Sequence, residues 1–344
     1  MERSTGNLVF GCDTSLRLWR KSHRDLAAFT GKNCEHQDSN KTGDKHMRNE
    51  HSSRVLFASG VAAALFLAGS ILAGAAHADS AISTKADPKL TAMLPAKVRE
   101  AGAIKVASNV EYPPFEYYDT DNTTIIGLDK DLADAIGQKL GIKLEFENMS
   151  FDAIIPALAA KRYDMAMSAM TDTEERRTKV DFVDYFTSGG GFLVKKGNPK
   201  NIHGLADICG VTAAIDKGTT EVEDAKKASE DCVKAGKAEV NVSVLPGTSK
   251  IVLALQSGRA DVAMIDTSAG AYISQQHKGD FEVPGASYAP RPYGLVLPKE
   301  SGELTKALQA TVQALIDDGT YGKILAKWGQ EVGAIKKATI NDGK

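Results

Sequence analysis

The 344-residue sequence has little net charge, few cysteines and no long block of lysine and arginine. Its 42 basic and 44 acidic side chains leave a formal charge of −2 at pH 7. A nucleic-acid-binding surface needs a concentration of positive charge, so we exclude nucleic acid as a partner. With 42% hydrophobic and 25% charged residues, the composition is that of an ordinary folded protein of one or two domains.

A hydrophobic segment near the N-terminus has the organisation of a secretory signal peptide. Two arginines precede an apolar run at 55–72, which is followed by the motif Ala-His-Ala at 76–78. This order predicts export and cleavage after Ala78. The alternative, an uncleaved membrane anchor, is disfavoured by the glycine and serine residues within the run. We assign 47–78 to the signal peptide and set aside 1–46 as a leader that is disordered or stems from a start codon assigned too early.

Only four cysteines are present, and Cys12 and Cys34 fall in the leader. In an oxidising compartment the remaining pair, Cys209 and Cys232, favours a disulfide. The alternatives are two free buried thiols or a metal pair, but two thiolates alone leave a metal site incomplete. We therefore expect no metal and no cofactor. Because no cysteine follows the apolar run, a lipid anchor is not expected, and the periplasm of a Gram-negative cell fits best.

Short apolar strands alternate with helical stretches through the rest of the chain. The clearest helix has leucine or isoleucine at every fourth position from 128 to 140, with Gly141 where a helix C-cap belongs. The other expected elements are strands at 104–107, 144–147, 164–168, 211–215 and 240–245 and a helix at 152–161. Strands alternating with helices predict an α/β fold with largely parallel sheets.

An internal repeat indicates two similar lobes. Residues 157–167, ALAAKRYDMAM, resemble residues 254–264, ALQSGRADVAM, in the pattern A-L-x-x-x-R-x-D-x-A-M. The pattern describes the end of a helix, a tight turn and a buried strand. Chance resemblance is the alternative, since such units share composition. Ligands bind beyond the carboxyl ends of parallel strands, so the loops at 168–173 and 265–268 are expected to meet across a cleft.

Two charged residues beside these loops could hold a free amino acid. A zwitterion needs an anion clamp and an ammonium acceptor close together. Arg176 follows the first loop, and a guanidinium suits bidentate carboxylate recognition; alternatively, it is a surface residue within the charged run 174–177. Asp266 ends an apolar strand, where an acid is costly unless it meets a cation or solvent. Its alternative role is the N-cap of the following helix.

Aromatic residues and a glycine turn offer further candidate contacts. Tyr112 precedes two prolines that hold the backbone extended, so the rings around them could wall a ligand side chain or belong to the core. Gly218-Thr219-Thr220 joins a strand to a polar helix, a geometry that presents backbone N–H groups to a carboxylate. Alone, this short turn is weak support for a site.

Together these stretches resemble family 3 of the extracellular solute-binding proteins of ABC transporters, in the polar amino acid group. The resemblance runs from about Ile104 to Trp328. Its most specific motifs are YPPFE at 112–116, GLDKDLA at 127–133, FDAIIPAL at 151–158, TDTEER at 171–176, VDF at 180–182 and DGTYGKI at 318–324.

The resemblance implies a periplasmic-binding-protein, or Venus-flytrap, fold with two α/β lobes joined by two hinge strands. Lobe 1 would comprise 104–192 and 289–336, lobe 2 would comprise 193–288, and 337–344 would form a tail. It also implies a carboxylate-binding role for Arg176 and an ammonium-accepting role for Asp266. The other ligand contacts that we predict are Asn109, Tyr112, Phe151, Ser168, Ala169, Thr171, Thr219 and Thr220.

The expected function is capture of a polar or neutral amino acid in the periplasm and delivery to an inner-membrane ABC permease by a monomer. Closure would use hinges near 188–193 and 289–293. Asn109 stands where members selective for cationic amino acids carry an acid, which disfavours lysine, arginine or histidine.

Two other function classes also occur as alternatives on this fold. One is a periplasmic dehydratase of prephenate-like substrates, with Glu111 or Asp172 as general acid, although no dedicated acid/base pair is visible. The other is the sensory lobe pair of a receptor, which would require a second membrane span or signalling domain after Trp328.

Overall fold

The computed structural model describes residues 82–343. The leader at 1–46 and the signal peptide at 47–78, with Cys12 and Cys34, lie outside the described residues. Within the described part, no helix is both long and apolar enough to cross a membrane.

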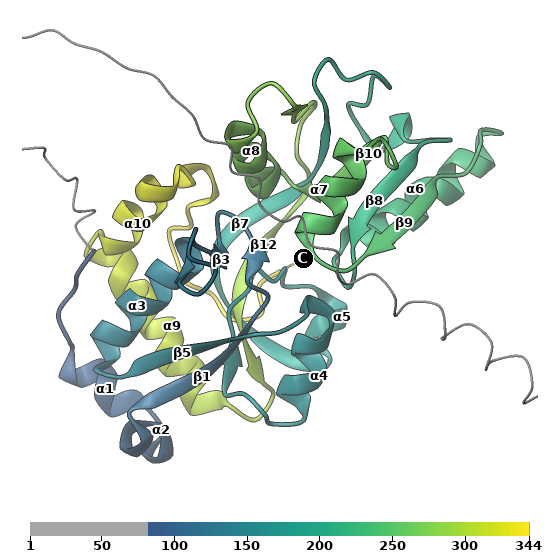
Figure 1. Cartoon of the computed structure of the whole chain (residues 1–344). Coiled ribbons are helices and arrows are strands. Elements are labelled where there is room, and N and C mark those ends of the chain that lie inside the picture. The colour runs from purple at the N-terminus through teal and green to yellow at the C-terminus, as the bar shows by residue number, and fades with distance from the viewer. Residues whose placement is uncertain (1–81, 344) are drawn as a thin grey trace, which may run out of the picture. The chain divides into compact units, whose positions relative to one another are not determined.

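One large sheet runs through both lobes, in the strand order β5-β1-β6-β12-β7-β10-β8-β9, with β11 beside β7 (Figure 1). Its strands are β1 (Ala103–Ser108), β5 (Lys143–Asn148), β6 (Met165–Ala166), β7 (Val180–Lys195), β8 (Thr212–Asp216), β9 (Asn241–Leu245), β10 (Val262–Asp266), β11 (Phe281–Glu282) and β12 (Tyr288–Pro298). A small sheet joins β2 (Glu111–Tyr112), β3 (Glu116–Tyr118) and β4 (Ile125–Ile126). Parallel pairs link β1 to β5 and β6 in lobe 1, and β8 to β9 and β10 in lobe 2.

Helices cover both faces of the sheet in each lobe. In lobe 1, Val106 and Ala107 of β1 point into separate core clusters, and in lobe 2 Ala213 and Ala214 of β8 do the same. The helices of lobe 1 are α1 (Pro88–Met93), α2 (Ala96–Ala101), α3 (Leu128–Leu140), α4 (Ile154–Ala159), α5 (Glu174–Arg177), α9 (Gly302–Asp317) and α10 (Thr320–Trp328). Those of lobe 2 are α6 (Glu221–Lys234), α7 (Thr248–Gln256) and α8 (Thr267–Gln276).

The predicted elements are found, and two of them are much shorter than predicted. Helix α3 ends at Gly141, which has the left-handed φ of 69° expected of a glycine C-cap. In place of the helix expected at 152–161, the chain forms a 3-10 turn at Phe151–Ala153 followed by the short α-helix α4. The strand expected at 164–168 pairs only at Met165–Ala166, because the chain then leaves the sheet to form a loop of the site.

The internal repeat forms the same unit in each lobe, α4 to β6 and α7 to β10. Its aspartates make equivalent bonds. Oδ2 of Asp164 accepts from Lys105 N of β1 at 2.9 Å, and Oδ2 of Asp261 accepts from Thr212 N of β8 at 2.9 Å. Each aspartate ties its turn to the neighbouring strand, and this equivalence confirms the prediction of two similar α/β lobes.

Strands β7 and β12 pair antiparallel and pass from one lobe into the other. Gly190 lies opposite Tyr288 in this pair. A Cβ atom at Gly190 would come within 2.4 Å of the Tyr288 ring, so a larger residue would force this ring to move. The expected hinges at 188–193 and 289–293 fall within these two strands, which are therefore the covalent links between the lobes.

A disulfide joins Cys209 to Cys232, 23 positions apart, as the sequence predicts. It fastens helix α6 to the segment that precedes β8. Closing a loop of this length stabilises the folded state by about 3 kcal/mol in the chain-entropy model.

Residues 337–344, which the sequence suggests as a tail, do not extend away from lobe 1 in their described part. Ala338 is only 2% exposed and belongs to the lobe 1 core. Ile340 forms an antiparallel bridge with Val183 of β7. A pattern of neighbouring residues cannot reveal this packing, because the partners lie far earlier in the chain.

Candidate functional site

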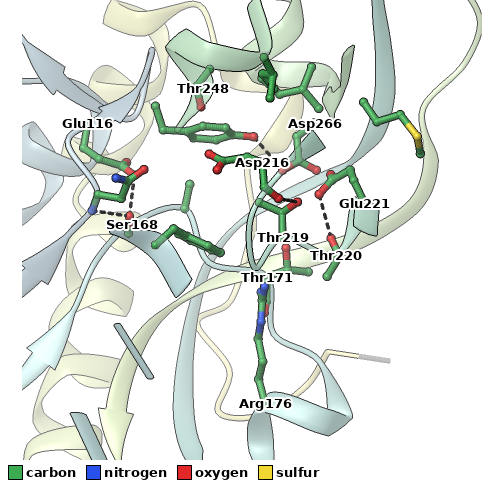
Figure 2. A pocket seen from close by; sticks show the side chains of 17 residues that line it. Glu116, Ser168, Thr171, Arg176, Asp216, Thr219, Thr220, Glu221, Thr248 and Asp266 are labelled. Atoms are coloured by element: carbon green, nitrogen blue, oxygen red, sulfur yellow. Dashed lines mark hydrogen bonds between the residues drawn. The ribbon is translucent and has the colours of Figure 1, made fainter. Parts of the chain in front are cut away.

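A cavity between the lobes gathers all ten residues that the sequence predicts as ligand contacts. The space between its walls, including the part open to solvent, is about 470 Å³. Figure 2 shows the side chains that line it. Lobe 1 contributes Asn109, Tyr112, Phe151, Ser168, Ala169, Thr171 and Arg176, and lobe 2 contributes Thr219, Thr220 and Asp266. The two loops nominated by the repeat therefore do meet across a cleft.

The cavity is also lined by seven residues that the sequence did not predict: Glu116, Asp216, Glu221, Thr248, Ile251, Met264 and Ile265. Asp216 ends β8 as Asp266 ends β10, so the strand-end rule that nominated one acid would also have found the other. Glu221 directly follows the predicted turn. Its burial had no signal in the sequence.

Arg176 is held at the lobe boundary by backbone oxygens from both lobes. Its Nη1 donates to Thr171 O at 2.8 Å, and its Nη2 donates to Gly218 O at 3.0 Å. The guanidinium lies over the Phe151 ring, 5.5 Å from the ring centroid. Desolvation lowers the pKa of Arg176. Because a guanidinium has five N–H donors, donors remain for a ligand carboxylate.

Asp266 lies across the cavity and is linked to lobe 1 through Tyr112. The tyrosine hydroxyl donates to Asp266 Oδ2 at 2.9 Å. Burial raises the pKa of Asp266, and the Tyr112 bond together with the field of Arg176 opposes that rise. A ligand cation would compensate the desolvation of this carboxylate.

The loop at 168–171 is held in place by hydrogen bonds to two buried acids, Glu116 and Asp129. The Ser168 hydroxyl donates to Glu116 Oε1 at 2.8 Å and accepts from Asn109 N at 2.9 Å, so this hydroxyl is used internally. Ala169 has a φ of 42°, an uncommon value for a residue with a side chain. Its N–H donates to Asp129 Oδ2 at 3.0 Å, which holds the loop in that conformation. Burial raises the pKa of Asp129 to about 6.

The N-terminus of helix α6 opens on the cavity and carries a buried glutamate. Glu221 is 4% exposed, and its carboxyl accepts a long bond of 3.4 Å from the Thr220 hydroxyl. Burial, followed by repulsion from Asp266, raises the pKa of Glu221 to about 8. Burial likewise raises the pKa of Asp216 to about 6. The Thr219 hydroxyl donates to Asp216 O at 3.0 Å and stabilises the turn.

The lobes are closed upon each other. Besides the bonds made by Tyr112 and Arg176, Lys217 of lobe 2 pairs with Asp152 of lobe 1 at 2.8 Å. Tyr117 of lobe 1 and Tyr272 of lobe 2 share a hydrogen bond of 2.9 Å between their hydroxyls. The site is therefore enclosed by direct contacts between the lobes.

The cavity presents one guanidinium on its lobe 1 side and several carboxyl groups on its lobe 2 side. This arrangement can bind a small molecule that carries both a carboxylate and a cationic group. Among residues 82–343, no cluster of three or more histidine, cysteine, aspartate and glutamate side chains is arranged to hold a metal ion.

A comparison with known protein families matches residues 104–331 to the bacterial extracellular solute-binding proteins, family 3. The chain belongs to this family. The match confirms the resemblance that the sequence motifs indicate, and solved structures of amino acid-binding proteins confirm the two-lobed fold.

This solute-binding protein has relatives that are named for amino acids. It is 33% identical over 256 residues to the arginine-binding protein ArgT of Corynebacterium glutamicum, covering 74% of this chain and 83% of that protein. An ancestral arginine-binding protein bound to arginine shares 36% identity with a TM-score of 0.61, covering 66% of this chain and 98% of that one. An ancestral arginine-binding protein bound to glutamine shares 35% identity with a TM-score of 0.61, covering 67% and 99%.

Proposed function

We propose that this protein captures a free α-amino acid between its lobes and delivers it to an ABC permease. The observation that carries the proposal is the placement of Arg176 and Asp266 on opposite lobes of one closed cavity. Arg176 would bind the ligand carboxylate through two parallel N–H···O bonds. Asp266 would accept the ammonium group.

The lining favours an amino acid whose side chain ends in a nitrogen donor. Glu116, Asp216 and Glu221 supply carboxyl groups besides the ammonium acceptor, whereas Arg176 is the single cationic side chain that lines the cavity in the described chain. Arginine and glutamine both end in N–H donors, and both names occur among the related solved structures. Asn109 argues for glutamine, and Glu221 argues for arginine.

We propose that the ligand binds one lobe first and that the lobes then close by bending of the two connecting strands, β7 and β12. Tyr112 and Arg176 make bonds across the closed boundary, and a ligand touching both lobes adds contacts that only the closed form can supply. A ligand shifts a conformational equilibrium only by its differential affinity for the two states. The closed surface would then be read by the permease.

The place of action that we propose is the periplasm, with the signal peptide at 47–78 cleaved after Ala78. We also propose that the mature protein works as a monomer, because one chain supplies both halves of the cavity.

Thermal unfolding of the mature protein, from Asp79 onward, against the common amino acids tests the function. A true ligand at a thousand times its Kd adds about 4 kcal/mol of stability by mass action. For a chain of this size that amounts to a rise in Tm of roughly 10 °C, at about 2–4 °C per kcal/mol. A panel without any shift would contradict amino acid capture.

The pH dependence of binding should distinguish arginine from glutamine. Because the pKa of Glu221 is about 8 in the ligand-free cavity, this residue is mostly protonated at pH 6. If an arginine side chain pairs with its carboxylate, affinity for arginine should rise with pH. Well below the pKa each pH unit costs about 1.4 kcal/mol, and half of the carboxyl groups are ionised at pH 8, so the rise reaches about fiftyfold between pH 6 and pH 8. Affinity for glutamine, whose side chain is uncharged, should change much less over this range, as measured by titration calorimetry.

The matched control is Glu221→Gln, which should remove the slope for arginine. The same substitution has an effect without ligand. Folding raises the pKa of Glu221 from 4.5 to about 8, so the stability that its proton contributes is complete below pH 4.5 and is lost as pH rises through 8. The Tm of the ligand-free variant should therefore fall less between pH 6 and pH 9. An unchanged arginine slope in the variant would assign the titration to another group.

The dehydratase alternative is favoured by one feature of the cavity. Burial raises the pKa of Glu221 to about 8, and an acid with a raised pKa can act as a general acid. The acids that the sequence nominated do not line the cavity. Glu111 accepts from Ser249, and Asp172 is buried behind the site. A prephenate-like dianion would also meet several carboxyls. We therefore propose a binding protein without enzymatic activity, and turnover of prephenate would contradict this.

A further inference from the structure

We propose that the segment Ala338–Gly343, here called the C-terminal strap, is a positioning element of the ligand site that holds the turn carrying Arg176 in place. The proposal rests on the proposed role of Arg176 in binding the ligand carboxylate. The strap lies beyond residue 331, where the family match ends.

The strap is anchored along the first part of β7. Asp184 N donates to Thr339 O at 2.9 Å, and Asn341 N donates to Phe182 O at 3.2 Å, so the strap continues the sheet. The Asn341 side chain returns two bonds, accepting from Phe182 N at 2.8 Å and donating to Asp181 Oδ1 at 2.9 Å. These bonds fix the strap before it reaches the ligand loop.

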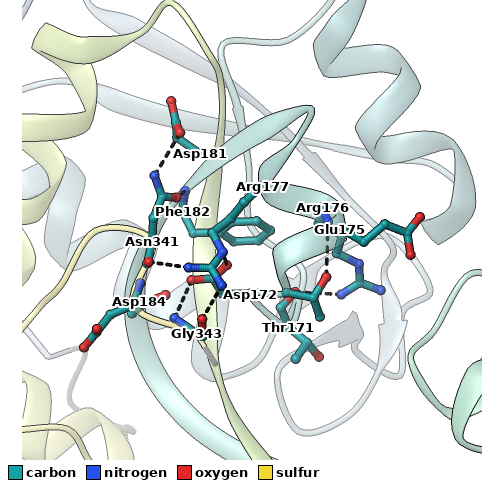
Figure 3. Close-up of polar contacts among 12 residues, drawn as sticks. Thr171, Asp172, Glu175, Arg176, Arg177, Asp181, Phe182, Asp184, Asn341 and Gly343 are labelled. Atoms are coloured by element: carbon teal, nitrogen blue, oxygen red, sulfur yellow. Dashed lines mark hydrogen bonds and ion pairs between the residues drawn. The ribbon is translucent and has the colours of Figure 1, made fainter.

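The end of the strap is bound by Arg177, the neighbour of the proposed ligand clamp (Figure 3). Nη1 of Arg177 donates to Asn341 O at 2.5 Å, Nη2 donates to Gly343 O, and Nε lies 3.2 Å from Asp172 Oδ1. Arg176 points into the cavity, whereas Arg177 points to the strap. The two adjacent arginines thus join the ligand site to the strap through one turn of backbone.

Asp172 forms a second link between the strap and the turn that carries Arg176. It is fully buried, and its Oδ2 accepts from Gly343 N at 2.8 Å. It stands between Thr171, whose carbonyl holds Arg176, and Thr173, whose hydroxyl accepts from Arg176 N at 3.2 Å. Both ends of the turn that carries Arg176 are therefore tied to the strap.

This support matters because helix α5, Glu174–Arg177, has only four residues. So short a helix is not stable by its own hydrogen bonds, and its geometry must come from its surroundings. A guanidinium displaced by about 1 Å loses the alignment that bidentate binding requires, and misplacements of that size can cost up to about a hundredfold in function.

Two full-length variants test the strap. Arg177→Lys keeps the charge but cannot form the planar fork that holds two carbonyls and a carboxylate. Gly343→Ala puts a Cβ atom 2.3 Å from Asp172 O and must displace the end of the strap. The matched control is Lys299→Met, which removes an ion pair with Asp181 at 2.8 Å next to the strap but touches neither Arg177 nor Asp172.

The first readout needs no ligand. Hydrogen exchange of the peptide covering 170–178 should be at least tenfold faster in both strap variants than in the wild type and the control. Unchanged exchange in both variants would overturn the proposal, whatever the function of the cavity.

The second readout compares L-arginine with L-arginine amide, which lacks the carboxylate. Both strap variants should lose about tenfold in affinity for L-arginine and much less for the amide, while the control keeps the wild-type ratio. Equal losses for both ligands, or no loss, would overturn the positioning role. If the wild type binds neither ligand, arginine is not the amino acid that it captures, and the exchange measurement alone decides on the strap.

Discussion

Replacing Arg176 with alanine should strongly weaken capture of the amino acid. The guanidinium is the only cation lining the described cavity and would face the ligand carboxylate at the closed boundary. Truncating one partner of a buried, hydrogen-bonded charge pair costs about 2–5 kcal/mol, which corresponds to roughly thirtyfold to several thousandfold in Kd. Titration calorimetry with the amino acid that gives the largest rise in Tm measures the effect.

Two companion variants separate charge from geometry. Arg176→Lys keeps a positive charge but loses the planar fork, so we expect an intermediate loss of affinity. Arg162→Ala is the matched control, because this arginine packs over Tyr163 outside the cavity and should bind as the wild type does. If Arg176→Ala bound within threefold of the wild type, the carboxylate would have to be held elsewhere.

Asp266→Asn should separate binding from stability. The amide keeps the shape and can still accept the Tyr112 hydroxyl, but it no longer offers a charge to the ligand ammonium. We expect the binding free energy to weaken by about 2–5 kcal/mol, which is the range for losing one member of a buried charge pair. The ligand-free protein should become more stable, since a desolvated carboxyl next to Glu221 is removed. Calorimetry and the ligand-free Tm together measure both effects.

The control for this variant lies at the other end of the same strand region. Asp261→Asn weakens the bond to Thr212 N that ties the repeat turn to β8, so it should lower the Tm while leaving affinity unchanged. The two aspartates thus have opposite expected profiles. A fall in ligand-free Tm with unchanged affinity in Asp266→Asn would show a structural role instead.

The sequence predicts the framework well because its signals are local. The four-residue spacing of α3, its glycine cap and the paired motif with Asp164 and Asp261 each depend on contacts within one or two neighbouring elements. The placement of Arg176 and Asp266 on one cavity follows in turn, since the repeat puts both loops at the carboxyl ends of parallel strands.

The parts that the sequence does not predict depend on distant contacts. Glu221 is an ordinary helix-start acid by its neighbours, and its raised pKa arises from its burial in the folded structure and from repulsion by Asp266, which lies far away in the sequence. The sequence predicts Ser168 as a ligand contact, but its hydroxyl donates a hydrogen bond to Glu116 of the small sheet. The C-terminal strap is held by backbone hydrogen bonds to β7, and such bonds leave no hydrophobic pattern in the sequence from which to predict them.

Because β7 and β12 connect the two lobes side by side, lobe 2 is inserted into lobe 1 as a single segment. Everything between the two strands is one uninterrupted stretch of chain, and it leaves and re-enters lobe 1 at adjacent positions, since Gly190 pairs with Tyr288. A single recombination of one gene segment could exchange this stretch without dividing the hydrophobic core of lobe 1. Asp266 and Glu221 would travel with it, while Arg176 would stay. Natural selection can thus change the residues of lobe 2 that line the cavity while the proposed carboxylate-binding residue of lobe 1 is inherited unchanged.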